Sequence, residues 1–167
     1  LSKKGSFLEK IKFFKNQKLQ RDTTNIKYVI SACNNMSQTK TGALIVLERN
    51  NNLNFLKSSG DEMNISVTQP ILESIFFKNS PLHDGAVIIS DNVIKATRVV
   101  LPINNETKIS NKYGLRHRAA VSITEKTDAL AIVVSEENGI ISYIKNGGFI
   151  QFSSQDELIK LLEKDIS

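Results

Sequence analysis

The run Ala129-Leu130-Ala131-Ile132-Val133-Val134 does most to decide the fold of this chain. It contains no polar side chain and is flanked by polar residues on both sides. Such a run is too short for a typical helix and is expected of a β-strand that is covered on both faces. A strand of that kind needs helices above and below its sheet, so the run predicts a layered α/β domain.

Similar apolar runs at 42–47 and 86–89 predict two further central strands. Turn-forming residues and shorter apolar segments extend the sheet on either side of these strands. The additional elements expected are a turn at Asp91-Asn92, a strand at 93–101, and strands at 139–144 and 149–152 around the turn Asn146-Gly147-Gly148.

Helical spacing of apolar residues, or a helix-start signal, marks the segments between these strands. Ser154 and Glu157 form a capping box that predicts a final helix. The other helices are expected at 7–20, 24–37, 70–77 and 115–127, with a polar loop at 102–113. The sequence therefore predicts an α/β fold in which a mixed central β-sheet is flanked by helices on both faces.

Composition is ordinary for a globular protein, with 40% hydrophobic residues among 167. The single cysteine, Cys33, excludes an internal disulfide or a cysteine zinc site, and its apolar neighbours indicate a buried thiol. No apolar run is long enough to span a membrane, and no signal-peptide pattern is present.

Positive charge is concentrated at the start of the chain. Residues 1–21 hold seven lysines or arginines and one glutamate, whereas the whole chain carries a net charge of +5, so residues 22–167 are nearly neutral. We therefore expect a basic amphipathic helical linker at 1–21 and one domain at 22–167. The linker could be a solvated helix face, could bind nucleic acid, or could lie against an anionic membrane below an upstream membrane anchor.

Both histidines lie in clusters of residues that can do chemistry. In the first cluster, Asp84 can accept a proton or orient a hydroxyl, and His83 can ligate a divalent metal. Gly85 and Ala86 have almost no side chain, so a ligand can approach the backbone there. The alternative is an ordinary Asp-Gly turn.

The second cluster is Gly114-Leu115-Arg116-His117-Arg118, at an expected helix start. Free N–H groups at a helix start attract anions, and arginines add fork-shaped donors for phosphate oxygens. The alternative is a solvated basic turn. Ser135-Glu136-Glu137 follows the strand at 129–134, which is a favourable position for site residues.

Taken together, these segments resemble the diadenylate cyclase domain family, and most closely its membrane-anchored branch. The matching motifs are Leu82-His83-Asp84-Gly85-Ala86 and Gly114-Leu115-Arg116-His117-Arg118-Ala119-Ala120. The similarity extends from about Gly42 to Glu137. It implies an enzyme that condenses two ATP molecules into cyclic di-AMP and two pyrophosphates, with each site formed where two copies of the domain face each other.

The resemblance also implies roles for single residues. Asp84 and Arg118 would be catalytic, with Asp84 activating the ribose 3′-hydroxyl, and His83 would ligate Mg²⁺ or Mn²⁺. The residues expected to bind the nucleotide are Gly85, Ala86, Leu101, Leu115, Arg116, His117, Arg118, Ser135 and Glu137.

Two positions depart from the family pattern. Leu115 stands where the family has threonine, and Val100 stands where relatives of this branch often have tyrosine. Leu115 motivates an alternative, a catalytically weakened regulatory domain that binds ATP or cyclic di-AMP. A nucleic-acid-binding module is disfavoured because residues 22–167 are nearly neutral. The resemblance implies a cytoplasmic domain tethered to the cell membrane.

Overall fold

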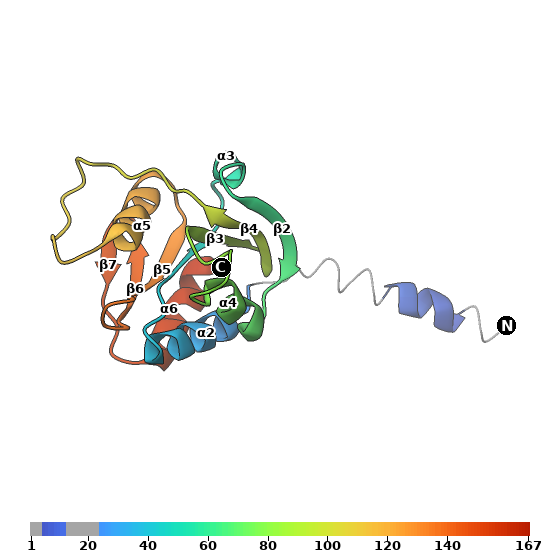
Figure 1. Cartoon of the computed structure of the whole chain (residues 1–167). Helices are drawn as coiled ribbons and strands as arrows, with labels where there is room; N and C mark the ends of the chain where they lie inside the picture. Colours follow the sequence, from blue (N-terminus) through green and yellow to red (C-terminus); the bar gives the residue numbers. More distant parts are fainter. Residues whose placement is uncertain (1–4, 13–23) are drawn as a thin grey trace.

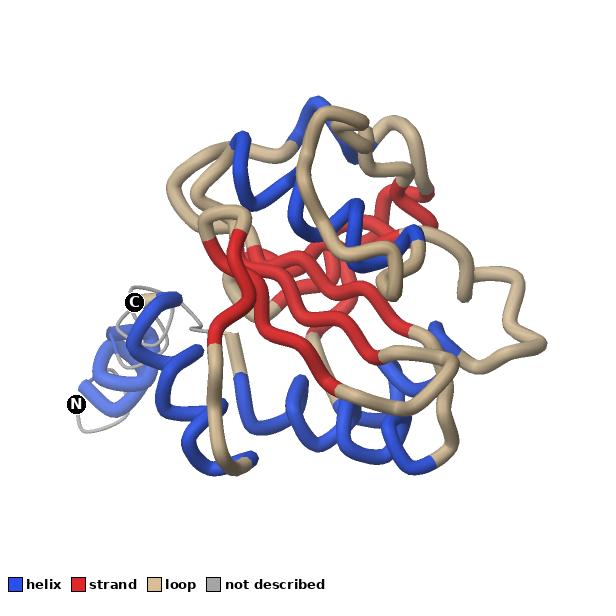
Figure 2. The backbone as a smooth tube through the Cα atoms, turned by 90° about the vertical axis from the view of Figure 1, so that its left-hand side faces the viewer, coloured by secondary structure: helices blue, strands red, loops and turns tan. Residues whose placement is uncertain are grey.

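A computed structural model describes residues 5–12 and 24–167 of the chain. Its centre is a seven-stranded sheet with the order β2-β4-β3-β1-β5-β6-β7. β1 (Ala43–Leu47) runs parallel to β3 (Ala86–Ser90) and antiparallel to β5 (Leu130–Val134), so the sheet is mixed. Every residue of β1 and β5 is buried, as expected from their apolar sequences. Figure 2 shows the strands as a layer between helices on either side.

The alternation of side chains along the strands divides the core into two layers. Ile45 faces a core completed by α2 (Ile26–Gln38), α4 (Gln69–Phe76) and α6 (Gln155–Ile166). Its neighbours Leu44 and Val46 face the other core, completed by α5 (Leu115–Lys126) and the short α3 (Asn54–Lys57). Figure 1 shows α5 on one side of the sheet and α2, α4 and α6 on the other. The predicted α/β fold with helices on both faces is thereby confirmed.

The outer strands are less apolar than the central ones. They are β2 (Asp61–Ser66) and β4 (Val93–Val99) on one side, and β6 (Ile141–Lys145) and β7 (Gly148–Ile150) on the other. The sequence did not predict α3 or β2, because β2 is an edge strand whose residues are mostly exposed. The strand predicted to reach Leu101 ends at Val99, and the two residues that follow form part of a cavity wall.

Capping side chains define where the helices begin. Asn25, Thr68 and Ser154 accept hydrogen bonds from the first turns of α2, α4 and α6. The predicted capping box is confirmed at Ser154 Oγ, which accepts from Glu157 N at 3.1 Å. The Glu157 carboxylate, however, accepts from Ser153 N at 2.8 Å rather than from the N-cap residue itself.

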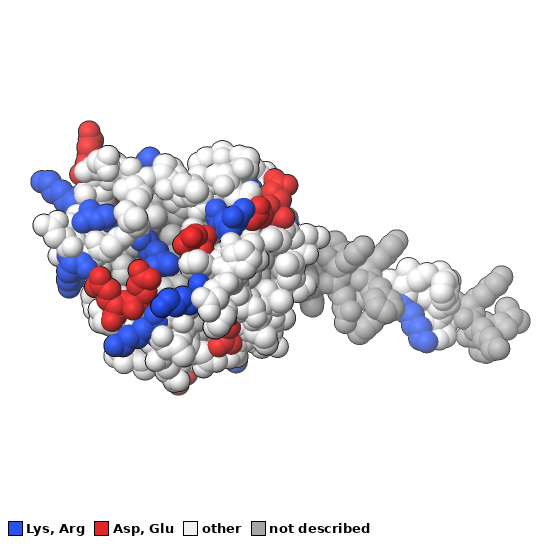
Figure 3. Space-filling model, viewed as in Figure 1, with Lys and Arg blue, Asp and Glu red and all other residues white. Residues whose placement is uncertain are grey.

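Residues 5–12 are helical, which agrees with the start of the helix predicted at 7–20. Residues 13–20 of that prediction lie outside the described part of the chain. Phe7, Leu8 and Ile11 are exposed on the described turns. Among the helices of residues 5–12 and 24–167, none is long and apolar enough to cross a membrane. Figure 3 shows acidic and basic side chains interspersed over the visible face of the folded body.

Candidate functional site

A cavity of about 1070 Å³ opens at the sheet end where β1 and β3 begin and β4 and β5 finish. Both histidine clusters and the segment after β5 contribute to it. The predicted site residues that line this cavity are His83, Asp84, Gly85, Leu101, Leu115, Arg116, His117, Ser135 and Glu137. His83 and Glu137, which lie 54 positions apart in the chain, therefore share one space, as the sequence analysis expected.

Two predicted residues are not among those that line the cavity. Ala86 is fully buried at the start of β3, where it packs in the core beneath α5. Arg118 is half-buried on α5, and its backbone carbonyl accepts a hydrogen bond from Ser122 Oγ at 2.9 Å. The roles assigned to both residues remain predictions.

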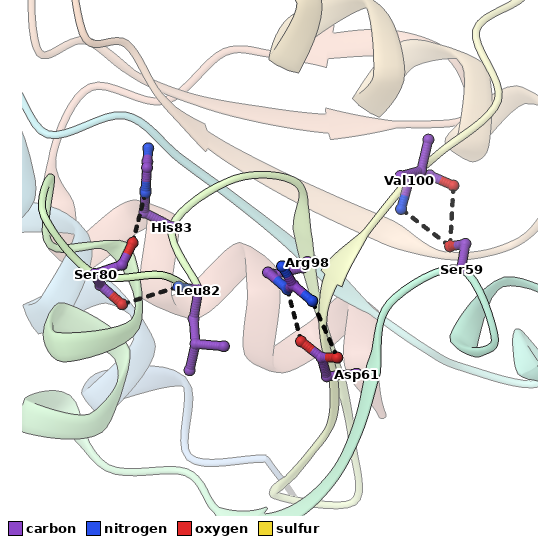
Figure 4. A network of polar contacts seen from close by, with 7 residues as sticks. All are labelled: Ser59, Asp61, Ser80, Leu82, His83, Arg98 and Val100. Carbon is purple, nitrogen blue, oxygen red and sulfur yellow. Dashed lines mark hydrogen bonds and ion pairs between the residues drawn. The ribbon is translucent and has the colours of Figure 1, made fainter.

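The Leu82–Gly85 segment presents a carboxylate to the cavity mouth. The side chain of Asp84 is 85% exposed, and its Oδ1 lies 3.2 Å from His83 Nε2. The other ring nitrogen of His83, Nδ1, lies 2.7 Å from the carbonyl oxygen of Ser80 (Figure 4). A carbonyl only accepts hydrogen bonds, so Nδ1 carries the proton and Nε2 is the nitrogen that faces Asp84.

This arrangement determines how His83 can act. With Nδ1 directed at Ser80, Nε2 of His83 faces the same space as the Asp84 carboxylate. A metal-ligating histidine commonly donates its other N–H to a backbone carbonyl, as His83 does to Ser80. The described residues contain no cluster of three or more His, Cys, Asp or Glu side chains that could hold a metal by themselves.

The start of α5 forms the opposite wall. Gly114 is the N-cap residue and makes no side-chain cap, and the first turn contains no acidic residue. Gly114, Leu115, Arg116 and His117 all line the cavity, so the free N–H groups of this first turn lie at its wall. An uncapped helix start of this kind attracts anions such as phosphate.

The Arg116 guanidinium lies beside Gly42, the residue that precedes β1. Its Nη1 is 3.4 Å from Glu136 Oε2, and a Cβ atom at Gly42 would lie 2.6 Å from its Cζ. The absence of a side chain at Gly42 therefore leaves room for the guanidinium. Arg116 is 25% exposed and Glu136 is 66% exposed, so a polyanion could replace Glu136 as the partner of Arg116.

Ser135 closes β5 with a tight turn. Its Oγ accepts from Glu137 N at 3.2 Å and from Asn138 N at 3.4 Å. Both contacts use the hydroxyl oxygen as acceptor, which leaves its hydrogen available for donation to a ligand oxygen. Glu137 is exposed at the same turn.

His117 is the second histidine, and its surroundings differ from those of His83. It is 8% exposed and lies 4.9 Å from the ring of Tyr113, which stacks on Phe149 at 4.7 Å. Burial, together with the nearby positive charge of Arg116, lowers the pKa of His117 below its ordinary value of 6.5. The ring is therefore neutral at physiological pH.

Apolar side chains form the remaining wall. Leu101 is 6% exposed and joins the core beneath α5, whereas Val100 is 67% and Leu115 74% exposed. All three line the cavity together with Ile103 and Ile140. Such a surface suits the flat, apolar face of a nucleobase.

Sequence reasoning missed several residues that line the cavity. They are Thr39, Lys40, Thr41, Lys78, Lys112 and Tyr113. The three residues before Gly42 close α2, where Thr39 Oγ1 and Thr41 Oγ1 lie 2.8 Å apart. A Thr-Lys-Thr-Gly run before a buried strand was a usable signal, whereas Lys78 and Lys112 lie in loops that carry no pattern.

Comparison with known proteins agrees with this geometry. The family model described as "DAC: DisA bacterial checkpoint controller nucleotide-binding" matches residues 30–149. The chain belongs to this nucleotide-binding family. The matched segment runs from α2 to β7 and includes every residue predicted for the site.

Curated relatives carry names that describe an activity. The chain is 44% identical to the diadenylate cyclase CdaS of Bacillus thuringiensis over 75% of its own length and 62% of that protein. It is 40% identical to the cyclic di-AMP synthase CdaA of Bacillus subtilis over 84% of its own length and 51% of that protein. The chain thus spans between about half and two thirds of the length of these relatives.

Solved structures show the same fold. The crystal structure of DacA from Staphylococcus aureus, in a double-mutant form, superposes with a TM-score of 0.80 at 38% identity. That match covers 84% of this chain and 93% of the other. The crystal structure of a "hypothetical membrane spanning protein" from Bacillus cereus gives a TM-score of 0.74 at 42% identity, over 78% of this chain and 65% of the other.

Proposed function

We propose that the chain is the catalytic domain of a diadenylate cyclase, which joins two ATP molecules into cyclic di-AMP and releases two pyrophosphates. The observation that carries the proposal is the shared cavity. An exposed carboxylate, Asp84, lies at one wall, and an uncapped helix start with Arg116 lies at another. The names of the relatives add independent support.

The nucleophile of this reaction is a ribose 3′-hydroxyl. The Asp84 carboxylate is exposed, so it can accept a hydrogen bond from the hydroxyl and take its proton as attack begins. The attacking oxygen forms a bond to the α-phosphorus, while the bond from that phosphorus to the bridging oxygen of pyrophosphate breaks. Two such attacks, one for each ATP, close the ring.

The electrophile is an α-phosphate with developing negative charge. The free N–H groups at the start of α5, the Arg116 guanidinium and the Ser135 hydroxyl are the donors that can stabilise this charge. Lys40, Lys78 and Lys112 add positive charge along the cavity for the remaining phosphates. The proposal also includes the predicted roles of Ala86 and Arg118 in nucleotide binding. It includes the predicted catalytic role of Arg118 as well.

A divalent metal, Mg²⁺ or Mn²⁺, fits the donor set at His83 and Asp84. Nε2 of His83 and Oδ1 of Asp84 lie 3.2 Å apart, with the tautomer of His83 fixed by Ser80. Two protein ligands leave several coordination positions for phosphate oxygens. When bound, the metal would neutralise phosphate charge as the α-phosphorus is attacked.

The product requires two sites that face each other. Cyclic di-AMP is two-fold symmetric, and each half needs one nucleophile and one electrophile. Two copies of the chain, each with one ATP, satisfy this symmetry through a single isologous contact. The high exposure of Asp84, Val100 and Leu115 supports the proposal. Side chains that a second copy would cover are exposed to solvent when the chain is alone.

A membrane tether is also part of the proposal, and it places the domain on the cytoplasmic side. Its support is the basic sequence of residues 1–21 and the name of the Bacillus cereus structure. Lys and Arg residues near anionic lipid contribute about 1 kcal/mol each to membrane binding. Sedimentation with anionic vesicles measures this contribution, and equal binding by neutral and anionic vesicles would exclude it.

A regulatory domain that binds ATP or cyclic di-AMP without turnover is the second candidate. It is favoured by Leu115, which places a 74% exposed apolar side chain, rather than a hydroxyl, at the helix start. The two candidates differ in one measurable property, because only the cyclase converts ATP.

The deciding experiment incubates the chain with ATP and Mn²⁺ and detects cyclic di-AMP by mass spectrometry. We expect product from the wild type and a loss of at least about a hundredfold in Asp84→Asn, because the amide cannot accept the 3′-hydroxyl proton. ATP binding should remain within about threefold in this variant, since the substitution preserves shape. Wild-type turnover by Asp84→Asn would rule out the proposed role of Asp84.

A further inference from the structure

A distorted segment of β4 lies directly behind the Asp84-Gly85 turn. Ala86 pairs with Val99 and Ile88 pairs with Ala96, so β4 contains one more residue than β3 between these pairs. This extra residue makes a β-bulge at 97–98. Within it, Arg98 holds a φ of +53°, a left-handed conformation that is strained for a residue with a Cβ atom.

A glycine lies against the backbone of the bulge on each of its two sides. On the β3 side, a Cβ atom at Gly85 would lie 2.7 Å from the carbonyl carbon of Arg98 and 2.8 Å from the oxygen of Val99. On the β2 side, a Cβ atom at Gly60 would collide with the carbonyl oxygen of Thr97. The backbone of the bulge therefore packs directly against the residue that follows Asp84.

The Arg98 side chain makes a two-pronged contact with the start of β2. Its Nε donates to Asp61 Oδ2 at 2.6 Å, and its Nη2 donates to Asp61 Oδ1 at 3.2 Å (Figure 4). Just beyond the ends of this strand pair, Val100 N donates to Ser59 Oγ at 3.0 Å. Ser59 and Asp61 thus form hydrogen bonds with β4 and the residue after it, at and beside the bulge.

The bulge is unfavourable by itself. Besides the strained φ of Arg98, the hydroxyl of Thr97 is buried without a hydrogen-bond partner among the described residues. The contact between Arg98 and Asp61 favours the strained conformation, because an extended Arg98 would carry the guanidinium away from the carboxylate. Local strain that the surroundings maintain is most often found beside functional sites.

We propose that Asp61 and Arg98 are positioning residues, which hold the β4 bulge in its left-handed conformation and so fix the Asp84-Gly85 turn at the cavity. They act through the backbone, since the bulge supports Gly85, and neither side chain lines the cavity. The inference rests on the proposed cyclase activity for its kinetic test, but not for its structural test.

The proposal predicts that Arg98→Gly impairs the chain less than Arg98→Ala does. Arg98→Ala removes the contact to Asp61 but keeps the strain, so the bulge should relax. Arg98→Gly also removes the contact, but glycine adopts a φ near +53° without strain, so the bulge should persist. Arg98→Gly should therefore keep the bulge conformation that Arg98→Ala loses. Asp61→Ala should match Arg98→Ala, and adding it to Arg98→Gly should have no further effect.

The experiment measures kcat, KM for ATP and hydrogen exchange of the peptide 82–90 in these variants. Lys27→Ala serves as control, because it removes an exposed positive charge from α2, away from β4. We expect kcat to fall about tenfold in Asp61→Ala and Arg98→Ala, with KM nearly unchanged and faster exchange at 82–86. Arg98→Gly, the double variant and Lys27→Ala should behave like the wild type.

Two results would overturn the inference. If Arg98→Gly is as impaired as Arg98→Ala, activity depends on the guanidinium charge and not on the backbone conformation of residue 98. If Asp61→Ala leaves both kcat and exchange unchanged, the contact does not hold the bulge. Should no form of the chain make cyclic di-AMP, the proposed function fails, and the exchange measurements still decide whether Asp61 and Arg98 fix the turn.

Discussion

Leu115 is the first residue of α5 and the most exposed large apolar side chain among those that line the cavity. Its backbone N–H remains at the helix start, but its side chain offers no hydrogen bond to a phosphate. Leu115→Thr adds a hydroxyl at this position. We expect ATP affinity or turnover to rise by up to about tenfold, equivalent to ~1.4 kcal/mol.

Calorimetry with ATP and initial rates of cyclic di-AMP formation test this expectation. Leu115→Val is the matched control, because valine has the branched shape of threonine without its hydroxyl. A gain shared by threonine and valine would assign the effect to side-chain size. A loss in both would mean that the cavity is packed around leucine.

His117 should make stability depend on pH. Its pKa is lowered in the folded state, first by burial and then by Arg116, while the unfolded state keeps the ordinary value of 6.5. As pH falls through about 6.5, the unfolded chain takes up a proton before the folded chain does, so stability decreases. The rings of Tyr113 and Phe149 face the His117 ring.

Urea unfolding at about pH 7.5 and about pH 5.5 measures this effect. The wild type should be less stable at the lower pH, and His117→Phe should lose less stability between the two values. Asp61, Glu157 and Asp165 have pKa values lowered from ordinary values of 3.8 to 4.5, so their stabilisation is lost only at lower pH. An equal decrease in both proteins would show that His117 is not the group responsible.

At the scale of elements, α5 joins the core to the site. Its inward face packs against β1, β5 and β6, while its first turn lines the cavity. The two arginines of this turn differ in placement, since Arg116 lines the cavity and Arg118 does not. Arg116→Ala should therefore weaken ATP binding by about tenfold or more, through loss of a charged donor. Arg118→Ala should have a smaller effect on one copy of the chain.

Calorimetry at concentrations where the chain is monomeric compares the two variants directly. Equal weakening by both substitutions would contradict a smaller role for Arg118, which lies outside the cavity. Unchanged affinity in Arg116→Ala would contradict the assignment of the α5 start as the phosphate site.

The same elements show what a sequence can reveal. The runs at 42–47, 86–89 and 129–134 predicted the central strands correctly, because burial on both faces leaves a run with no polar residue. β2 has no such pattern, and Gly60, which precedes it, is explained only by the close approach of β4. Lys78 and Lys112 reach the cavity from loops, so only the folded chain brings them to the site.

At the scale of the whole molecule, the sheet end that carries the cavity combines charge of both signs. Lys40, Lys78, Lys112 and Arg116 lie around it with the carboxylates of Asp84, Glu136 and Glu137. This near balance suits a site that holds a polyanion together with a divalent cation, and it differs from the single-sign surface of a nucleic-acid-binding protein. In the proposed reaction each such site would hold one ATP, whereas the product contains two nucleotides.

Pairing of two chains should therefore limit the rate at low concentration. If each copy supplies one ATP, activity per chain should rise with total concentration and reach a plateau when pairs predominate. Initial rates over a dilution series, with light scattering at each concentration, test this prediction. The rise should coincide with the appearance of the dimer, because a monomer holds a 3′-hydroxyl without the second α-phosphate that it must attack. Constant activity per chain in samples that contain only monomer would contradict the paired-site mechanism.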